Sequence, residues 1–174
     1  MISYQVQSEK GFTDKIGELV CMLEHSRAVT ITEVAELTQE ELDECEPGGN
    51  SIGMLLSHIA AIEYVHQVIS FEHRDLTEEE MEEWGPALEL GEKAQQKYHS
   101  LSIDEYLDVM EAIRDQTLDL LKEKDDAWLY ENREWPNGVS YNPYYLWFHV
   151  MEDEISHRGQ IRSKLRAWNN KAAL

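Results

Sequence analysis

The sequence has little cysteine, little proline and few basic residues. Of its 174 residues only two are cysteine and four are proline, and 15 lysines and arginines stand against 35 aspartates and glutamates. Two cysteines, without an apolar leader in the first residues, argue against a disulfide framework, so Cys21 and Cys45 are expected to be reduced thiols of a cytoplasmic protein. The formal charge of -20 argues against a nucleic-acid partner, because phosphate backbones are bound by clustered lysines and arginines.

Long hydrophobic runs are also lacking. No stretch approaches the roughly 18 consecutive apolar residues of a membrane span, so we expect no membrane partner. A content of 42% hydrophobic and 9% aromatic residues is ordinary for a globular protein. At this length, residues 1–174 are expected to form a single domain with one core.

The apolar residues recur mainly with helical spacing, and no strong strand signal competes. Four segments are predicted to be long amphipathic helices: residues 12–37, 50–73, 102–124 and 142–168. This pattern predicts an all-α fold, a four-helix bundle. The connection at about 75–101, with a capping box at Thr77 and a break at Trp84-Gly85-Pro86, predicts a short helical insertion at the surface. The segment 128–141, around Pro136-Asn137-Gly138, predicts a small hairpin or ordered loop.

The last of these helices carries the clearest functional signal. Asn142 and Pro143 form a good helix start, and His149, Asp153 and His157 then fall within its apolar stripe. Buried imidazoles and a carboxylate need partners, which a divalent cation or ordinary hydrogen bonds would supply. Residues eight apart lie about 12 Å apart along a helix axis, so His149 and His157 are not expected to share one ion. The usable pair is therefore Asp153 with either histidine.

A third ligand must come from another helix. His58 lies three residues after Leu55 and four before Ile62, so it shares their inward face and is the natural choice. His66 lies near the edge of the same face, where contact with the site is an open alternative. His73 and His99 are expected to be exposed.

Two segments carry a resemblance to a known family. NSIGMLLSHIAAIE at 50–63 and MEDEISHRGQIRSKLR at 151–166 resemble the signature segments of the DinB-like superfamily. The resemblance implies a four-helix bundle that holds a divalent metal through three side chains, here His58, Asp153 and His157. Asp153 stands where the family usually has histidine. The resemblance also implies either reactions with a low-molecular-weight thiol or no established activity, and often a dimer.

Two imidazoles and a carboxylate can hold zinc with an open position and match the facial triad of ferrous enzymes. The ion is expected to be zinc, nickel, manganese or iron, with the carboxylate favouring the harder ions. A metal-activated thiol or water would attack a small electrophile, with His149 as the catalytic base or an outer partner. Glu63 and Arg158 are expected to make structural bonds. The alternative is a non-catalytic dimeric bundle with a degenerate metal site, related to stress or to small-molecule binding.

Two further expectations concern packing. Gly159 inside a helix costs about 1 kcal/mol relative to alanine, which suggests that a neighbouring helix approaches closely there. The tryptophans exceed what one four-helix core readily buries, and Trp147 lies next to the inward stripe but outside it. Such outward aromatic residues, together with the resemblance, predict a homodimer.

Overall fold

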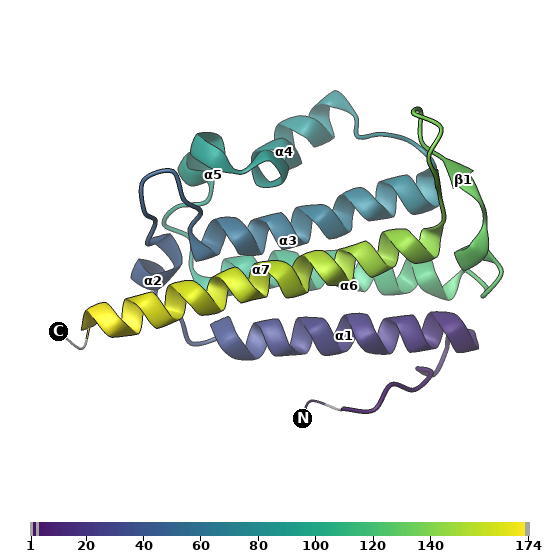
Figure 1. Ribbon diagram of the computed structural model, residues 1–174, viewed down its shortest axis with the longest axis horizontal. Helices are drawn as coiled ribbons and strands as arrows, with labels where there is room; N and C mark the ends of the chain where they lie inside the picture. Colours follow the sequence, from purple (N-terminus) through teal and green to yellow (C-terminus); the bar gives the residue numbers. More distant parts are fainter. Residues whose placement is uncertain (1, 3, 173–174) are drawn as a thin grey trace.

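The computed structural model describes residues 2 and 4–172. Its long helices are α1 (Asp14–Val34), α3 (Ile52–Gln67), α6 (Ile103–Lys122) and α7 (Pro143–Ala172). They pack lengthwise, with α1 and α7 running in one direction and α3 and α6 in the other (Figure 1). This arrangement confirms the predicted all-α four-helix bundle.

The connections contain the short elements. These are α2 (Gln39–Asp43), η1 (Val68–Glu72), α4 (Glu78–Glu89), α5 (Gly91–Lys97), η2 (Trp128–Tyr130), β1 (Arg133–Glu134) and β2 (Ser140–Tyr141). The two strands pair antiparallel, with Arg133 opposite Tyr141, and form the small hairpin predicted before the last helix. Because α3 and α6 run parallel, the chain must return along the bundle between them, and α4 and α5 make that return along the outside of α3 (Figure 1). The predicted insertion is therefore the crossover connection of the bundle.

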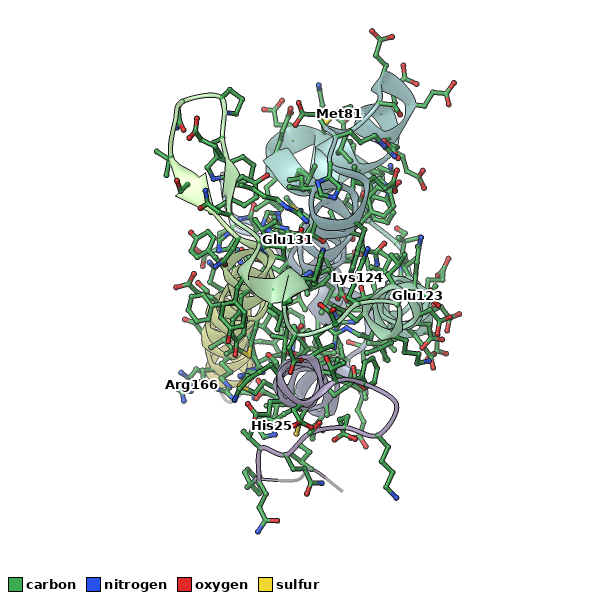
Figure 2. All side chains as sticks on the ribbon, turned by 90° about the vertical axis from the view of Figure 1, so that its right-hand side faces the viewer. His25, Met81, Glu123, Lys124, Glu131 and Arg166 are labelled. Carbon is green, nitrogen blue, oxygen red and sulfur yellow. The ribbon has the colours of Figure 1, made fainter. Side chains whose placement is uncertain are left out.

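Viewed along the bundle, α4 lies beyond α3 on one side, and the segment before α1 lies beyond α1 on the opposite side (Figure 2). The ring of His25 on α1 meets the ring of Tyr4 from that segment, with centroids 5.7 Å apart. The crossover and this amino-terminal segment thus cover two opposite sides of the bundle.

Side chains near the helix starts fix where the helices begin. Thr38, Ser51, Thr77 and Ser102 each accept a hydrogen bond from the backbone N–H three residues later. The Asn142 side chain accepts one from the N–H of Tyr145 at 2.8 Å, as its position before Pro143 predicts.

The break predicted at Trp84-Gly85-Pro86 is wrong, because α4 continues through Pro86 to Glu89. Proline removes one N–H, but its carbonyl still accepts the N–H of Leu90 at 3.0 Å. The helix ends at Glu89, because the φ of the next residue, Leu90, is 60°.

The core contains Trp147, which contradicts the expected outward position. Trp147 is 0% exposed, and its ring lies 5.6 Å from that of Phe71 in η1. Phe71 also stacks on Trp128 of η2 at 5.0 Å. More of the surface of α7 is buried than its apolar stripe predicts, because η1 and η2 cover the end of the bundle at which α7 begins.

The close approach expected at Gly159 is also wrong. A Cβ added at Gly159 would meet nothing within 4 Å, whereas one added at Gly53 would lie 2.3 Å from the hydroxyl oxygen of Tyr106. The tight contact between helices is therefore the one between α3 and α6 at Gly53.

The stretch Ile52–Glu72, formed by α3 and η1, is long and apolar enough to cross a membrane, and 78% of its apolar window is buried within the protein. The core helix of a soluble bundle has this same character. α3 is the central helix here, and it supplies one residue of the candidate metal centre.

Candidate metal centre

His58 from α3 and Asp153 and His157 from α7 come together inside the bundle. Each offers one ligand atom, and these atoms all lie within 4.8 Å of one another. Oδ1 of Asp153 is 3.4 Å from Nε2 of His157 and 3.8 Å from Nε2 of His58. The two imidazole rings meet edge to face with centroids 4.6 Å apart. We refer to these three residues as the triad.

The crossover holds the His58 ring in a defined tautomer. Its Nδ1 lies 2.8 Å from the carbonyl oxygen of Ala87 in α4. Because a carbonyl can only accept, Nδ1 carries the proton and Nε2 has a lone pair directed toward Asp153. A metal-binding histidine is usually fixed in this way by a hydrogen bond from its other nitrogen.

Not all polar atoms of the triad have a hydrogen-bond partner. Oδ2 of Asp153 and Nδ1 of His157 are buried without a hydrogen-bond partner. Burial disfavours the Asp153 carboxylate, but His157 and His58 outweigh burial and hold its pKa well below the usual value. Burial lowers the pKa of His58, while Asp153 and the Ala87 carbonyl raise it to a net value above the ordinary one. Both shifts favour a positive charge between these groups, either a proton or a metal ion.

The donor set fits a divalent metal. Two imidazole nitrogens and a carboxylate oxygen can bind zinc, and the same set of ligands binds the iron of many ferrous enzymes. Both arrangements leave positions open for a substrate. The buried and unpartnered Asp153 oxygen is the kind of atom that such an ion would satisfy.

His149 lies outside the triad, next to His66. Its ring centroid is 5.5 Å from that of His66, and its Nδ1 is 3.3 Å from Oε2 of Glu152. That His149 and His157 do not share an ion stays a prediction. The catalytic role predicted for His149 stays a prediction.

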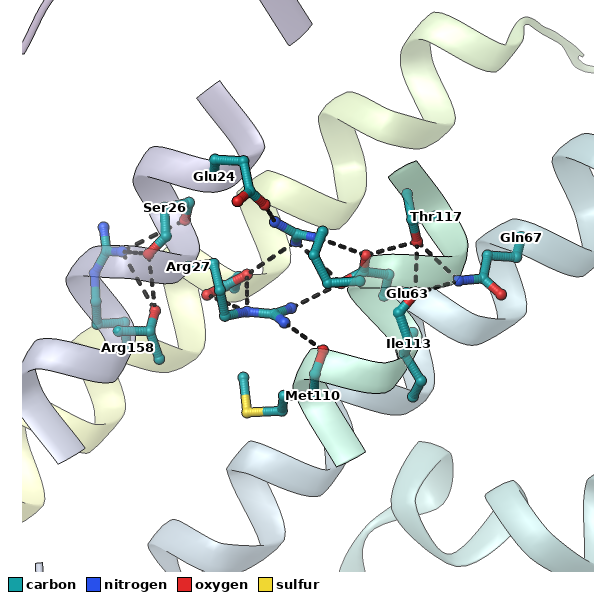
Figure 3. Close-up of polar contacts among 12 residues, drawn as sticks. Glu24, Ser26, Arg27, Glu63, Gln67, Met110, Ile113, Thr117 and Arg158 are labelled. Atoms are coloured by element: carbon teal, nitrogen blue, oxygen red, sulfur yellow. Dashed lines mark hydrogen bonds and ion pairs between the residues drawn. The ribbon is translucent and has the colours of Figure 1, made fainter. Parts of the chain in front are cut away.

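A buried ionic network links all four long helices (Figure 3). Arg27 of α1 binds Glu63 of α3 at 2.7 Å and Glu154 of α7 at 3.2 Å. Arg114 of α6 binds Glu63 at 2.7 Å. The two arginines balance the two glutamates in charge, so the network is internally neutral. The structural role expected for Glu63 is confirmed.

Burial disfavours the Glu63 carboxylate, but Arg114 and Arg27 lower its pKa to about 2. Arg158 also makes a structural bond, because its Nη1 donates to the carbonyl of Ser26 at 2.8 Å.

Sequence reasoning missed three residues that contribute to the site and its surroundings. Ala87 acts through its backbone carbonyl, which no side-chain pattern reveals. In the structure Gly85 and Ala87 are buried, so α4 is more than a surface element. Arg114 and Glu154 look like ordinary charges of amphipathic helices. The available signal is that each falls at an inward helical position, where a lone charge would be costly.

A pocket of about 510 Å³ opens on another side of α7. Met151, Ile155 and Arg158 line it from α7, together with Cys21 and His25 of α1. Successive residues of an α-helix are rotated by about 100° around its axis, so these α7 side chains point away from Asp153 and His157. The pocket is therefore separate from the triad.

Comparison with known protein families identifies the family of the chain. A family model described as mycothiol-S-transferase matches residues 18–167. The chain belongs to the mycothiol-S-transferase family. This family is part of the DinB-like superfamily, so the resemblance of the two signature segments is confirmed.

A solved structure supports the fold of this mycothiol-S-transferase family member. The crystal structure of an uncharacterised protein from Escherichia coli UTI89 matches with a TM-score of 0.62 over 88% of this chain and 94% of that chain, at 15% identity. At this identity the likeness shows the fold alone. Among curated proteins, none matches the chain.

Proposed function

We propose that this protein is a divalent-metal-dependent transferase that acts on a low-molecular-weight thiol and a small electrophile. The observation that carries the proposal is the convergence of the triad, whose ligand atoms lie within 4.8 Å of one another inside the bundle. The family description, mycothiol-S-transferase, supports a thiol as one substrate. Hydrolysis by water at the same centre is the closest variant of this reaction.

In this proposal His58, Asp153 and His157 hold the ion. The ion supplies Lewis acidity, which lowers the pKa of a thiol or water and so provides an anion at neutral pH. Asp153 reduces the net positive charge of the centre by one unit compared with three imidazoles, so this effect is weaker here. The Ala87 carbonyl keeps His58 oriented, through the hydrogen bond at 2.8 Å.

His149 is positioned for proton transfer at the edge of the site. Its side chain is 39% exposed, and Nδ1 faces the Glu152 carboxylate. A carboxylate at Nδ1 orients an imidazole and leaves Nε2 to accept a proton, which suits a general base. In this proposal His149 takes the proton of the thiol and releases it to solvent.

We place the protein in the cytoplasm. Both cysteines are free and half-buried, as expected in a reducing compartment.

Elemental analysis of the purified protein tests the proposal, with variants His58→Ala and His157→Ala. We expect one tightly bound equivalent in the wild type and loss of that equivalent in each variant, with helical content retained by circular dichroism. His99→Ala, at a side chain 58% exposed, is the matched control. Well under one equivalent in the wild type, with no stabilisation by added zinc, nickel, manganese or iron, would remove the basis of the proposal.

The second candidate is a non-catalytic bundle that binds a small molecule. The pocket of about 510 Å³ beside Met151 and Ile155 favours it, because this volume suits a small ligand and lies away from the triad. Two variants distinguish the two candidate functions. Ligand binding that survives His157→Ala but is lost in Ile155→Trp would assign the pocket, whereas thiol transfer requires His157.

A further inference from the structure

A second pair of imidazoles faces each other across the same two helices that form the triad. His66 follows His58 by eight residues on α3, and His149 precedes His157 by eight residues on α7. Because α3 and α7 run in opposite directions, His66 and His149 are both displaced from the triad toward the same end of the bundle (Figure 1). The rings of His66 and His149 have centroids 5.5 Å apart and planes inclined at 51°.

Both rings use Nδ1 for a hydrogen bond and keep Nε2 for another partner. Nδ1 of His66 donates to the carbonyl oxygen of Ile62 at 2.7 Å, so Nε2 carries the lone pair. Nδ1 of His149 lies 3.3 Å from the Glu152 carboxylate, which can only accept when ionised. An outer hydrogen bond of this kind fixes the ring and increases the basicity of the ligating nitrogen in metal-binding histidines.

The spacing of the two rings suits one ion. Imidazoles that bind one ion through nitrogen at about 2.1 Å place their ring centroids about 5 Å apart. The rings of His58 and His157 in the triad are 4.6 Å apart, and those of His66 and His149 are 5.5 Å apart. The half-exposed position of His149 leaves its ring room to turn toward a shared ion.

The charges around the rings of His66 and His149 also favour a cation. His66 is 7% exposed, and burial lowers its pKa to about 4, so the ring stays neutral and able to ligate near neutral pH. Carboxylates lie around the pair: Glu152 at His149, and Asp153 and Glu63, whose charges act on His66. A divalent ion would therefore meet carboxylate charge and the neutral ring of His66.

We propose that His66 and His149 bind a second divalent transition-metal ion, separate from the ion of the triad and more weakly held. The weaker binding follows from having two protein ligands, compared with three in the triad. Imidazole pairs suit zinc, nickel and copper better than magnesium or calcium. The inference goes beyond the proposed function and requires no catalytic activity.

One consequence links the two sites. Metal binding and proton transfer would both use Nε2 of His149, so the two roles exclude each other. Occupancy of the second site should therefore suppress any reaction that needs His149 as a base, and excess metal should be inhibitory.

Titration with Co²⁺, followed by equilibrium dialysis and visible absorption, tests the inference on the whole chain. The wild type should bind two equivalents of unequal affinity. His66→Gln and His149→Gln should each weaken the second equivalent by about tenfold or more while keeping the first. His73→Gln, which removes an exposed imidazole just beyond η1, is the matched control and should keep both.

The outcomes separate this inference from the proposed function. A wild type that saturates at one equivalent, lost in His157→Gln, would overturn the second site and leave the triad intact. A second equivalent that persists in both His66→Gln and His149→Gln would assign it to surface carboxylates and also overturn the inference. If circular dichroism shows that His66→Gln does not fold, His149→Gln decides the matter, because that side chain lies at the edge of the bundle.

Discussion

Asp153 differs from the two histidines beside it in charge and in hardness as a ligand. Its Oδ1 approaches both imidazoles, and its Oδ2 is buried without a partner. A carboxylate in this position accepts harder ions than a third imidazole would. If the triad binds an ion as proposed, this side chain should have the main influence on its metal preference.

We predict that Asp153→His strengthens the binding of zinc or nickel relative to manganese by about tenfold or more, because imidazole is the softer ligand. Competition titrations with each metal measure the ratio. Asp153→Asn is the control: it keeps the size and removes the charge, and should weaken all of these metals. An unchanged ratio in Asp153→His would mean that residue 153 is not a ligand.

The site residues were predictable in part from the sequence. His58, Asp153 and His157 fall at inward helical positions, and the resemblance to the DinB-like superfamily names the same positions. The proximity of His66 to His149 was not predicted, because helical spacing gives the face of one helix but not its rotation or register against another. Those two quantities decide which side chains meet across α3 and α7.

At the scale of elements, the ionic network of Arg27, Glu63, Arg114 and Glu154 joins the four long helices. Each member is at most 5% exposed, and the charges cancel within the network. Removing one charge would leave another buried and unpaired, which is costly even where the intact pair adds little. Glu63 lies five residues beyond His58 and Glu154 directly follows Asp153, so the network also fixes the helices that carry the triad.

We predict that Glu63→Gln lowers the free energy of unfolding by about 3–5 kcal/mol, measured by urea denaturation at pH 7. Glu24→Gln is the matched control: Glu24 also binds Arg114, but its side chain is 47% exposed, so its loss should cost about 1 kcal/mol or less. Equal losses in the two variants would contradict the structural role of the network.

The same variant has a pH signature. The pKa of Glu63 falls from 4.5 to about 2 on folding, so its ionised form contributes stability above pH 4.5. This contribution is lost as the pH falls from 4.5 toward 2, because the unfolded chain then binds the proton first. Glu63→Gln should therefore lose less stability than the wild type over that interval.

Element boundaries were predictable where local chemistry sets them. The capping box at Thr77 starts α4 as expected, because a side chain and a backbone N–H three residues apart suffice. The expectations at Gly159 and Trp147 were wrong, because packing at each depends on segments distant in the sequence. Phe71 and Trp128 cover Trp147, and no neighbouring atom lies within 4 Å of a Cβ added at Gly159.

At the scale of the whole molecule, burial of Trp147 changes the reason for expecting a dimer. In the described part of α7, the large aromatic and aliphatic residues left exposed are Tyr145, Phe148 and Ile155, at 52%, 46% and 46%. Their spacing places them on one side of the helix. An exposed stripe of this composition is typical of protein contacts, and two-fold dimers are the commonest closed assembly.

We predict a homodimer formed through this stripe, with a mass near twice 20.3 kDa in sedimentation equilibrium at micromolar concentration. Phe148→Glu should convert it to a monomer, because a second copy would bury the new charge twice across the two-fold axis. Val109→Glu on α6 is the matched control: Val109 is 45% exposed and lies away from the stripe. Since the chain carries a net charge of -20, raised salt should strengthen the association by screening repulsion. A monomer mass at both low and high salt would contradict the prediction, and a dimer unaffected by Phe148→Glu would place the contact elsewhere.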